Sequence, residues 1–330
     1  MATAKRKKWK RRTRESSIFG SAKAPDPFPI SRSKLEMFHS CPRCFWIDRV
    51  AGVGRPGIPA FTLNSQVDAI LKREFDVHRA AGTPHPYMAE HGLGHMVPLD
   101  HAMMDEWREN FKGVRITKHG LSLFGAVDDI WKAEDGDGEE WHVVDYKSTA
   151  TNNEITPELF LVDIYKGAYV RQMAIYQWLL KELGHPVSTR GFFVYENGNN
   201  SADTLLSGGP EDSPRGIPLR PVTVIEIDTA DDSVVIEGER IDFDWVENLA
   251  IGAKACLELY KAASGRGVLR VLRVLLCQLL DIVQNYSRLT CCAGTFHPSR
   301  TTPESPAPRC SARRCPSSPR TGCRPRGRPA

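Results

Sequence analysis

The sequence predicts an α/β fold, with one domain over about residues 31–262. Three observations lead to this prediction. Apolar residues recur at helical spacing in Leu63–Arg79 and Ile164–Leu183. Two β-prone runs, Leu121–Trp131 and Trp141–Ser148, flank the turn-forming segment AEDGDGEE. Strand-like runs also follow the second helix, so helices and strands alternate within one domain.

The first elements are predicted to be helical. Ser31 begins the segment SRSKLEMFHSCPRCFWIDRV, which Ser31 or Ser33 can cap. A Gly/Pro break at 52–59 separates it from the amphipathic helix Leu63–Arg79. We expect residues 82–101, rich in Gly, Pro and His, to be irregular, and Asp105–Phe111 to form a short helix.

The pattern then changes to strands. We expect the helix Ile164–Leu183 to end at Gly184 and Pro186. The predicted elements after it are the strands Gly191–Tyr195, Val222–Ile227 and Ser233–Glu237 and the helix Asp244–Ala263.

The charges divide the chain into three parts. Residues 1–30 are basic and then rich in Ser, Ala and Pro, so we expect them to be disordered. Residues 263–330 contain Arg, Pro and Cys but no Lys. They are either a disordered basic tail or an out-of-frame translation of the original C-terminus. Residues 15–261 hold 24 basic and 38 acidic groups, a net charge of −14.

A polyanionic partner would therefore need a local basic surface, the basic ends or a bound cation. Arg43, Lys72 and Arg171 are candidates for the local surface. No run approaches the roughly 18 apolar residues of a membrane span, and the N-terminus lacks the apolar stretch of a signal peptide. We expect a cytoplasmic location and no membrane partner. Six of the nine cysteines lie in 277–323, which is unlike a disulfide scaffold.

Strand geometry brings two acids and a lysine together. Residues two apart in a strand share a face, so Asp145 and Lys147 project to the same side. A two-residue turn at Gly136–Asp137 would pair residues whose numbers sum to 273, which places Asp128 opposite Asp145. An odd-length turn would present Asp129 instead.

These residue types suit metal-assisted phosphodiester cleavage. Two opposed carboxylates repel each other unless one is protonated or a cation lies between them. Mg²⁺ binds one or two carboxylates together with waters and phosphate oxygens, and a lysine beside it can orient the attacking water and offset developing charge. Gln172 and Tyr176, four apart on the next helix, can add an amide and a phenol to this site.

The order of these motifs resembles the PD-(D/E)XK nuclease superfamily, specifically its RecB-like branch, which includes nucleases of CRISPR spacer acquisition and nuclease modules of recombination helicases. The resemblance covers about residues 30–262 and rests on SRSKLEMFHSCPRCFW, GAVDD, VVDYKS and QMAIY. It implies a restriction-endonuclease-like core, in which a small mixed β-sheet is flanked by helices, and Mg²⁺ or Mn²⁺ as cofactor. The residues that it implies for the site are Asp128 and Asp145 as metal ligands, Tyr146 as a ligand through its backbone carbonyl, Lys147 as the catalytic lysine, and Gln172 and Tyr176 as the following motif.

The chain departs from this pattern at two places. Many RecB-like members carry a metal-binding His in an HxxL context, whereas VDAIL places Asp68 there, as either a metal ligand or a solvated helix residue. Several members bind an iron–sulfur cluster through one N-terminal and three C-terminal cysteines. Cys41 and Cys44 form a CxxC half-site, which needs two more ligands to bind an iron–sulfur cluster or zinc. Cys256 lies in a predicted helix, and the tail has no second CxxC. We therefore expect no intact cluster.

One further cluster could bind zinc. His85, His91, His95 and His101 share one stretch, but glycines at 92 and 94 argue against a helix that presents His91 and His95 together.

The sequence therefore predicts a metal-dependent DNA nuclease that acts on single strands or duplex ends in repair, recombination or CRISPR-type processing. No GxxxxGK[ST] signature is present, so a helicase or other unwinding partner would be a separate protein. The alternatives are a catalytically silent nucleic-acid-binding module of the same fold, and an unrelated α/β protein whose carboxylates are structural.

Overall fold

The computed structural model describes residues 10–56, 62–135, 138–149, 151, 155–156, 166–197 and 222–262. Of the tails predicted to be disordered, residues 1–9 and 263–330 lie outside these ranges. Residues 10–30 lie within them and include strand residues at Lys10–Arg11, a short helix at Glu15–Ser17 and the start of a strand at Phe28, so the prediction of disorder is wrong for this part.

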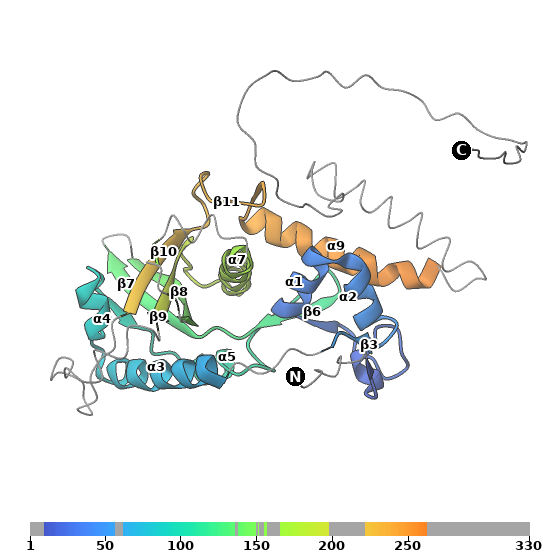
Figure 1. Ribbon diagram of the computed structural model, residues 1–330, viewed down its shortest axis with the longest axis horizontal. Helices are drawn as coiled ribbons and strands as arrows, with labels where there is room; N and C mark the ends of the chain where they lie inside the picture. Colours follow the sequence, from blue (N-terminus) through green and yellow to red (C-terminus); the bar gives the residue numbers. More distant parts are fainter. Residues whose placement is uncertain are drawn as a thin grey trace, which may run out of the picture. The chain divides into compact units, whose positions relative to one another are not determined.

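A five-stranded mixed sheet organises the described chain, in the order β10-β9-β8-β7-β4 (Figure 1). Its strands are β4 (Met96–Pro98), β7 (Asp129–Asp135), β8 (Gly138–Thr149), β9 (Arg190–Asn197) and β10 (Val222–Asp228). β8 and β9 run parallel, and the other neighbours are antiparallel. Val143 and Val144 are both fully buried, because helices cover both faces of this sheet.

A second sheet of three strands precedes it along the chain. Its order is β2-β6-β5, formed by Phe28–Ser31, Leu121–Gly125 and Val114–Lys118. β2 runs parallel to β6 and β5 runs antiparallel to it. Two small strand pairs complete the described β-structure: β1 (Lys10–Arg11) with β3 (Val53–Gly54), and β11 (Val235–Ile236) with β12 (Glu239–Arg240).

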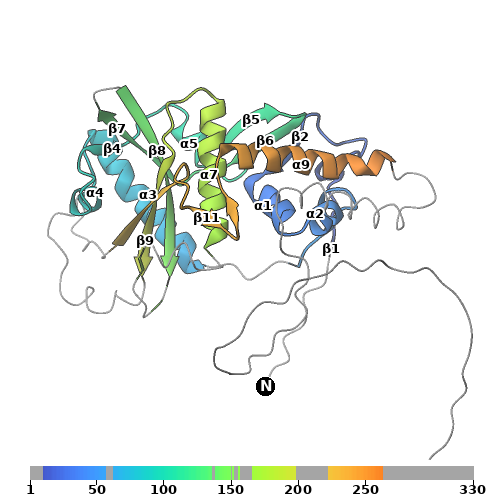
Figure 2. The same cartoon turned by 90° about the horizontal axis from the view of Figure 1, so that it is seen from above.

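The helices differ in length and in what they cover. The described helices are η1 (Glu15–Ser17), α1 (Arg32–Ser40), α2 (Pro42–Arg49), α3 (Thr62–Ala81), α4 (Pro86–Glu90), α5 (Met104–Trp107), α7 (Gly167–Glu182) and α9 (Phe243–Ala262). Figure 2 shows α3 and α7 on opposite sides of the five-stranded sheet, with α9 beside α1 and α2.

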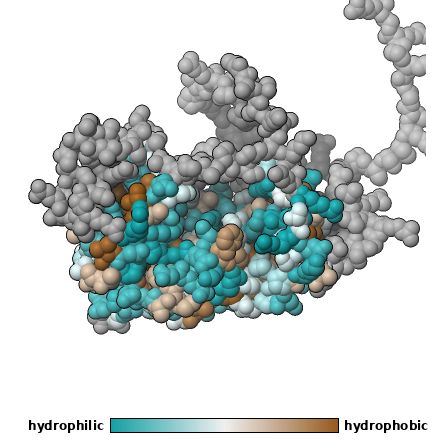
Figure 3. Space-filling model, turned by 90° about the horizontal axis from the view of Figure 1, so that it is seen from below, coloured by the Kyte–Doolittle hydropathy of each residue, from teal (hydrophilic) through white to brown (hydrophobic). Residues whose placement is uncertain are grey.

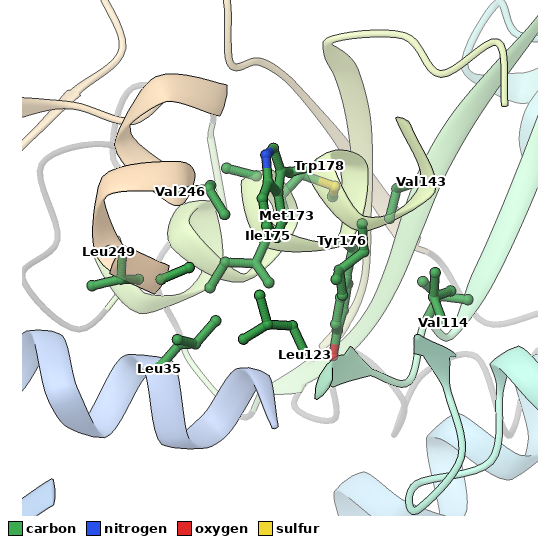
Figure 4. Close-up of a cluster of buried hydrophobic side chains, with 14 of the residues drawn as sticks. Leu35, Val114, Leu123, Val143, Met173, Ile175, Tyr176, Trp178, Val246 and Leu249 are labelled. Carbon is green, nitrogen blue, oxygen red and sulfur yellow. The ribbon is translucent and has the colours of Figure 1, made fainter. Parts of the chain in front are cut away.

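Two apolar clusters correspond to the two faces of the sheet. On the α7 face, Val143 and Phe193 join a large cluster with α1, α9 and the three-stranded sheet. Figure 4 shows its centre, where Met173 and Tyr176 of α7 approach Val143, Leu123 and Val114. On the α3 face, Val144, Tyr146 and Phe192 pack with Phe75. Odd-numbered residues of β8 therefore face α7 and even-numbered ones face α3.

Most of the predicted elements are confirmed, and the hairpin register is among them. β7 and β8 pair Asp129 with Val144 and Ile130 with Val143, so paired residue numbers sum to 273. The turn residues 136–137 lie outside the described residues. α3, α7, β9, β10 and α9 agree with their predicted segments to within a few residues. α7 begins at Gly167, and residues 164–165 of its predicted segment lie outside the described residues.

Four predictions are wrong in detail. The helix expected from Ser31 is two helices, because Pro42 begins α2 and its ring disfavours a helical conformation at Cys41, whose φ and ψ are −166° and 92°. Ser31 ends β2, and its hydroxyl bonds that of Ser33 and does not cap α1. The run Leu121–Trp131 is two strands of different sheets. Residues 82–101 contain α4 and β4, and β5 was not expected.

The face seen from below is mainly hydrophilic, with only small apolar patches among the described residues (Figure 3). None of the described helices combines the length and apolarity that crossing a bilayer requires.

Candidate active site

Four predicted site residues meet on the α7 face of the sheet. Gln172 donates from its amide to Asp145 Oδ1 at 2.6 Å and to the Tyr176 hydroxyl at 3.1 Å. The Lys147 ammonium contacts Asp145 Oδ2. Asp145 is fully buried, so β8 and α7 hold its carboxylate between a cation and an amide. The two-residue spacing in β8 and the four-residue spacing in α7 produce this meeting, as the sequence predicts.

Asp128 lies where the chain passes from one sheet to the other. β6 ends at Gly125 and β7 begins at Asp129, so Asp128 directly precedes the strand that pairs with β8. Its Oδ2 accepts a hydrogen bond from the backbone N–H of Tyr146 at 3.0 Å. A Cβ at Gly125 would lie 2.5 Å from the Tyr176 ring, so the glycine of the GxxD motif lets α7 approach.

α3 contributes an acid and a second lysine. The Lys72 ammonium lies 2.9 Å from Asp68 Oδ1 and 3.0 Å from Asp128 Oδ1. Asp68, the residue in place of the expected histidine, is thus beside Asp128. The i,i+4 spacing of Asp68 and Lys72 was visible in the sequence, but the contact with Asp128 was not, because it depends on the approach of α3 to the strand end.

A network centred on the buried Asp129 supports the site from the α3 face. Asp129 Oδ1 accepts from Arg79 at 2.6 Å, and its Oδ2 accepts from the Tyr146 hydroxyl at 2.7 Å. Asp76 bonds both Arg79 and Arg108. Asp129 and Tyr146 adjoin Asp128 and Asp145, so the network holds together the two strand segments that carry the site acids. Sequence reasoning missed it because it joins residues 50 positions apart.

Burial and charge shift the ionisation of these groups. Burial lowers the pKa of Lys147 to about 8, although the charge of Asp128 opposes this shift. Burial disfavours the charge on Asp128, but the charges of Lys72 and Lys147 outweigh it and lower its pKa. For Lys72, burial is outweighed by the carboxylates of Asp128 and Asp68, so its pKa is raised. Burial and the charge of Asp128 raise the pKa of Asp68.

Comparison with known families agrees with this geometry. Residues 29–206, more than half of the chain, match the family model described as the PD-(D/E)XK nuclease superfamily. The chain belongs to this superfamily. The prediction of an unrelated α/β protein is therefore wrong, and the mixed sheet flanked by helices agrees with the restriction-endonuclease-like fold. No match to the chain is found among curated proteins.

Proteins of the superfamily are generally nucleases and typically use Mg²⁺ or Mn²⁺. The oxygens of Asp128 and Asp145 fit such an ion, because they already receive the Lys72 and Lys147 ammonium groups and two N–H donors. The two carboxylates therefore already attract positively charged groups, and one or two carboxylates suffice to bind Mg²⁺. Within the described ranges, no three His, Cys, Asp or Glu side chains gather into a metal-binding group.

The other candidate ligands lie elsewhere. Cys41 Sγ accepts from the Cys44 N–H at 3.2 Å and so caps α2, and the Cys256 thiol lies 3.8 Å from the Pro42 carbonyl. The three described cysteines are free thiols. Sequence reasoning did not foresee the approach of Cys256, because it depends on how α9 packs against α2.

The histidines have separate environments. His85 is buried, stacks on Phe75 and accepts from the Tyr87 N–H. His91 bonds the Val222 carbonyl, and His101 stacks on Trp107.

The suggestion that Arg171 contributes to a positive surface is wrong. Its guanidinium is buried and forms ion pairs with Glu36 at 2.8 Å and Glu237 at 3.4 Å. Arg32 was not predicted, but its charge lowers the pKa of Lys147 and its hydrogen bond favours the ionised form of Tyr176, so it lies close to both.

Proposed function

We propose that this chain is a metal-dependent nuclease that hydrolyses phosphodiester bonds in DNA. The observation that carries the proposal is the bonded group of Asp145, Lys147, Gln172 and Tyr176 with Asp128 at the adjoining strand end. A purely structural role would not require a lysine and a side-chain amide to converge on one fully buried carboxylate, since burying such groups is costly.

The proposed roles follow from the contacts. Asp128, Asp145 and the Tyr146 carbonyl would hold Mg²⁺ or Mn²⁺, with Asp68 as a further candidate ligand. When bound, the ion supplies a water of lowered pKa and positive charge for the phosphate oxygens. Lys147, whose pKa is lowered to about 8, orients the attacking water and offsets charge on the phosphate. Gln172 fixes the orientation of the Asp145 carboxylate and positions the Tyr176 hydroxyl.

We also propose membership of the RecB-like branch and action on single strands or duplex ends, in repair, recombination or CRISPR-type processing. The support is the bonded Gln172–Tyr176 pair on the helix after the DxK strand. Any helicase or recombination partner would be a separate chain.

The test is digestion of linear single- and double-stranded DNA with Mg²⁺ or Mn²⁺ and with EDTA. We expect metal-dependent cleavage that Lys147→Met reduces about 10²–10³-fold. Lys132→Met is the matched control, because Lys132 lies on the neighbouring strand and pairs with Glu134 and Glu139. DNA binding without cleavage would support the catalytically silent module, and the absence of both would refute a nucleic-acid role.

A further inference from the structure

The Lys72 ammonium occupies a place between two carboxylates. It lies 2.9 Å and 3.0 Å from the two oxygens of Asp68, and 3.0 Å from Asp128 Oδ1. Three carboxylate oxygens thus surround one cationic nitrogen. The side chain is about one-fifth exposed, so water screens these contacts only in part.

This place is also where a divalent ion would bind Asp128. Mg²⁺ binds carboxylate oxygens at about 2.0–2.1 Å, whereas a lysine nitrogen stays about 2.7–2.9 Å from them. An ion that binds Asp128 Oδ1 while the ammonium keeps its hydrogen bond there brings two positive charges close together, so the ion and the ammonium compete for this oxygen.

We propose that Lys72 is an internal competitor for the metal ion: it neutralises Asp68 and Asp128 in the metal-free protein and separates from Asp128 when the ion binds. The inference rests on the proposed function, since it takes Asp128 as a metal ligand. Lys72 is then a positioning residue that sets the metal affinity of the site. Its contact with Asp68 persists after the separation, because the two residues are neighbours on one helix.

The exchange has two consequences. Without Lys72, Asp68 and Asp128 repel each other in the metal-free protein, and a divalent ion relieves that repulsion. With Lys72, the ion must first displace an ammonium that three oxygens hold, so the wild-type protein binds it more weakly than a variant without the lysine.

The first experiment measures Mn²⁺ binding by calorimetry or electron paramagnetic resonance without DNA. We expect Lys72→Met to lower the dissociation constant about tenfold or more and to lower the melting temperature without metal, with recovery at saturating Mn²⁺. Lys166→Met is the matched control for loss of a nearby charge, because the charge of Lys166 acts on Lys147 while its ammonium bonds Tyr195. Unchanged or weaker binding by Lys72→Met, or an equal effect of Lys166→Met, would overturn the inference.

A second experiment uses the wild-type protein, so it does not depend on the folding of a variant. Brief acetylation of lysines followed by mass spectrometry should show more labelling of Lys72 with saturating Mn²⁺ than without it, and no change at Lys132. Unchanged labelling of Lys72 at saturation would refute the displacement.

The two proposals fail in different ways. Asp128→Asn should abolish Mn²⁺ binding. If the wild-type protein binds no Mn²⁺ and cleaves no DNA, both proposals are wrong. If it binds Mn²⁺ through Asp128 and cleaves DNA while Lys72 does not respond, only the role of Lys72 is wrong.

Discussion

Removal of the Arg79 guanidinium should destabilise the fold directly behind the site. Arg79 pairs with Asp129 at 2.6 Å and with Asp76 at 3.2 Å, and it also donates to the Leu99 carbonyl. Asp129 is fully buried, so Arg79→Met leaves a charge without its counter-ion. Breaking a buried pair from one side costs about 3–5 kcal/mol. The hydrogen bonds from the Tyr146 hydroxyl and the Ile130 N–H remain, so we expect about 3 kcal/mol.

The assay is urea unfolding followed by tryptophan fluorescence, since Trp131 is fully buried beside this network. Arg73→Met, on the exposed side of the same helix, should change the free energy of unfolding by less than about 0.5 kcal/mol. Asp129→Asn removes the buried charge that Arg79→Met leaves unpaired. Its cost in free energy of unfolding should therefore be at least about 1 kcal/mol smaller in the Arg79→Met background than in the wild-type protein. A loss below about 1 kcal/mol for Arg79→Met, or additive effects in the double variant, would refute the reasoning.

Three further changes test other parts of the structure. Gly125→Ala places a Cβ 2.5 Å from the Tyr176 ring. It should lower the free energy of unfolding by about 1–3 kcal/mol and reduce cleavage activity. No change in either quantity would mean that α7 moves to accommodate the methyl group. Burial lowers the pKa of His85 from 6.5 to about 3, so the folded state disfavours the protonated imidazole. The free energy of unfolding should therefore fall by up to about 3 kcal/mol as the pH decreases from 6.5 to 4.5. His85→Asn should flatten this part of the profile of unfolding free energy, measured in urea, against pH. Asp48→Asn removes the buried negative charge that three cationic side chains contact, so it should lower the free energy of unfolding in urea by about 3–5 kcal/mol. A loss under about 1 kcal/mol would show that water solvates those cations in the variant.

The sequence predicted the part of the site that follows from local periodicity. The two-residue repeat of a strand placed Asp145 and Lys147 on one face, and the symmetric turn set the register that brings Asp128 beside them. The four-residue repeat of a helix paired Gln172 with Tyr176. These relations span few residues, so they can be worked out without knowledge of the tertiary structure.

What escaped prediction depends on contacts between distant segments. A continuous β-prone run does not reveal that the chain changes sheets between Gly125 and Asp129, because both halves have the same propensity. The contact of Lys72 with Asp128 and that of Arg79 with Asp129 require α3 to lie along the sheet, and helix periodicity gives only the buried side of a helix, not its partner.

The passage between the two sheets also determines where the chain can change length. Asp128 follows Gly125 by three residues. The glycine lies against Tyr176 of α7, and the aspartate accepts a hydrogen bond from the N–H of Tyr146, which follows Asp145 in β8. One inserted residue would turn the carboxylate to the opposite face of the sheet. The turn at 136–137 has no such constraint, because two added residues there preserve the register. Among related chains, insertions should therefore accumulate at the hairpin turn and be absent between the glycine and the aspartate.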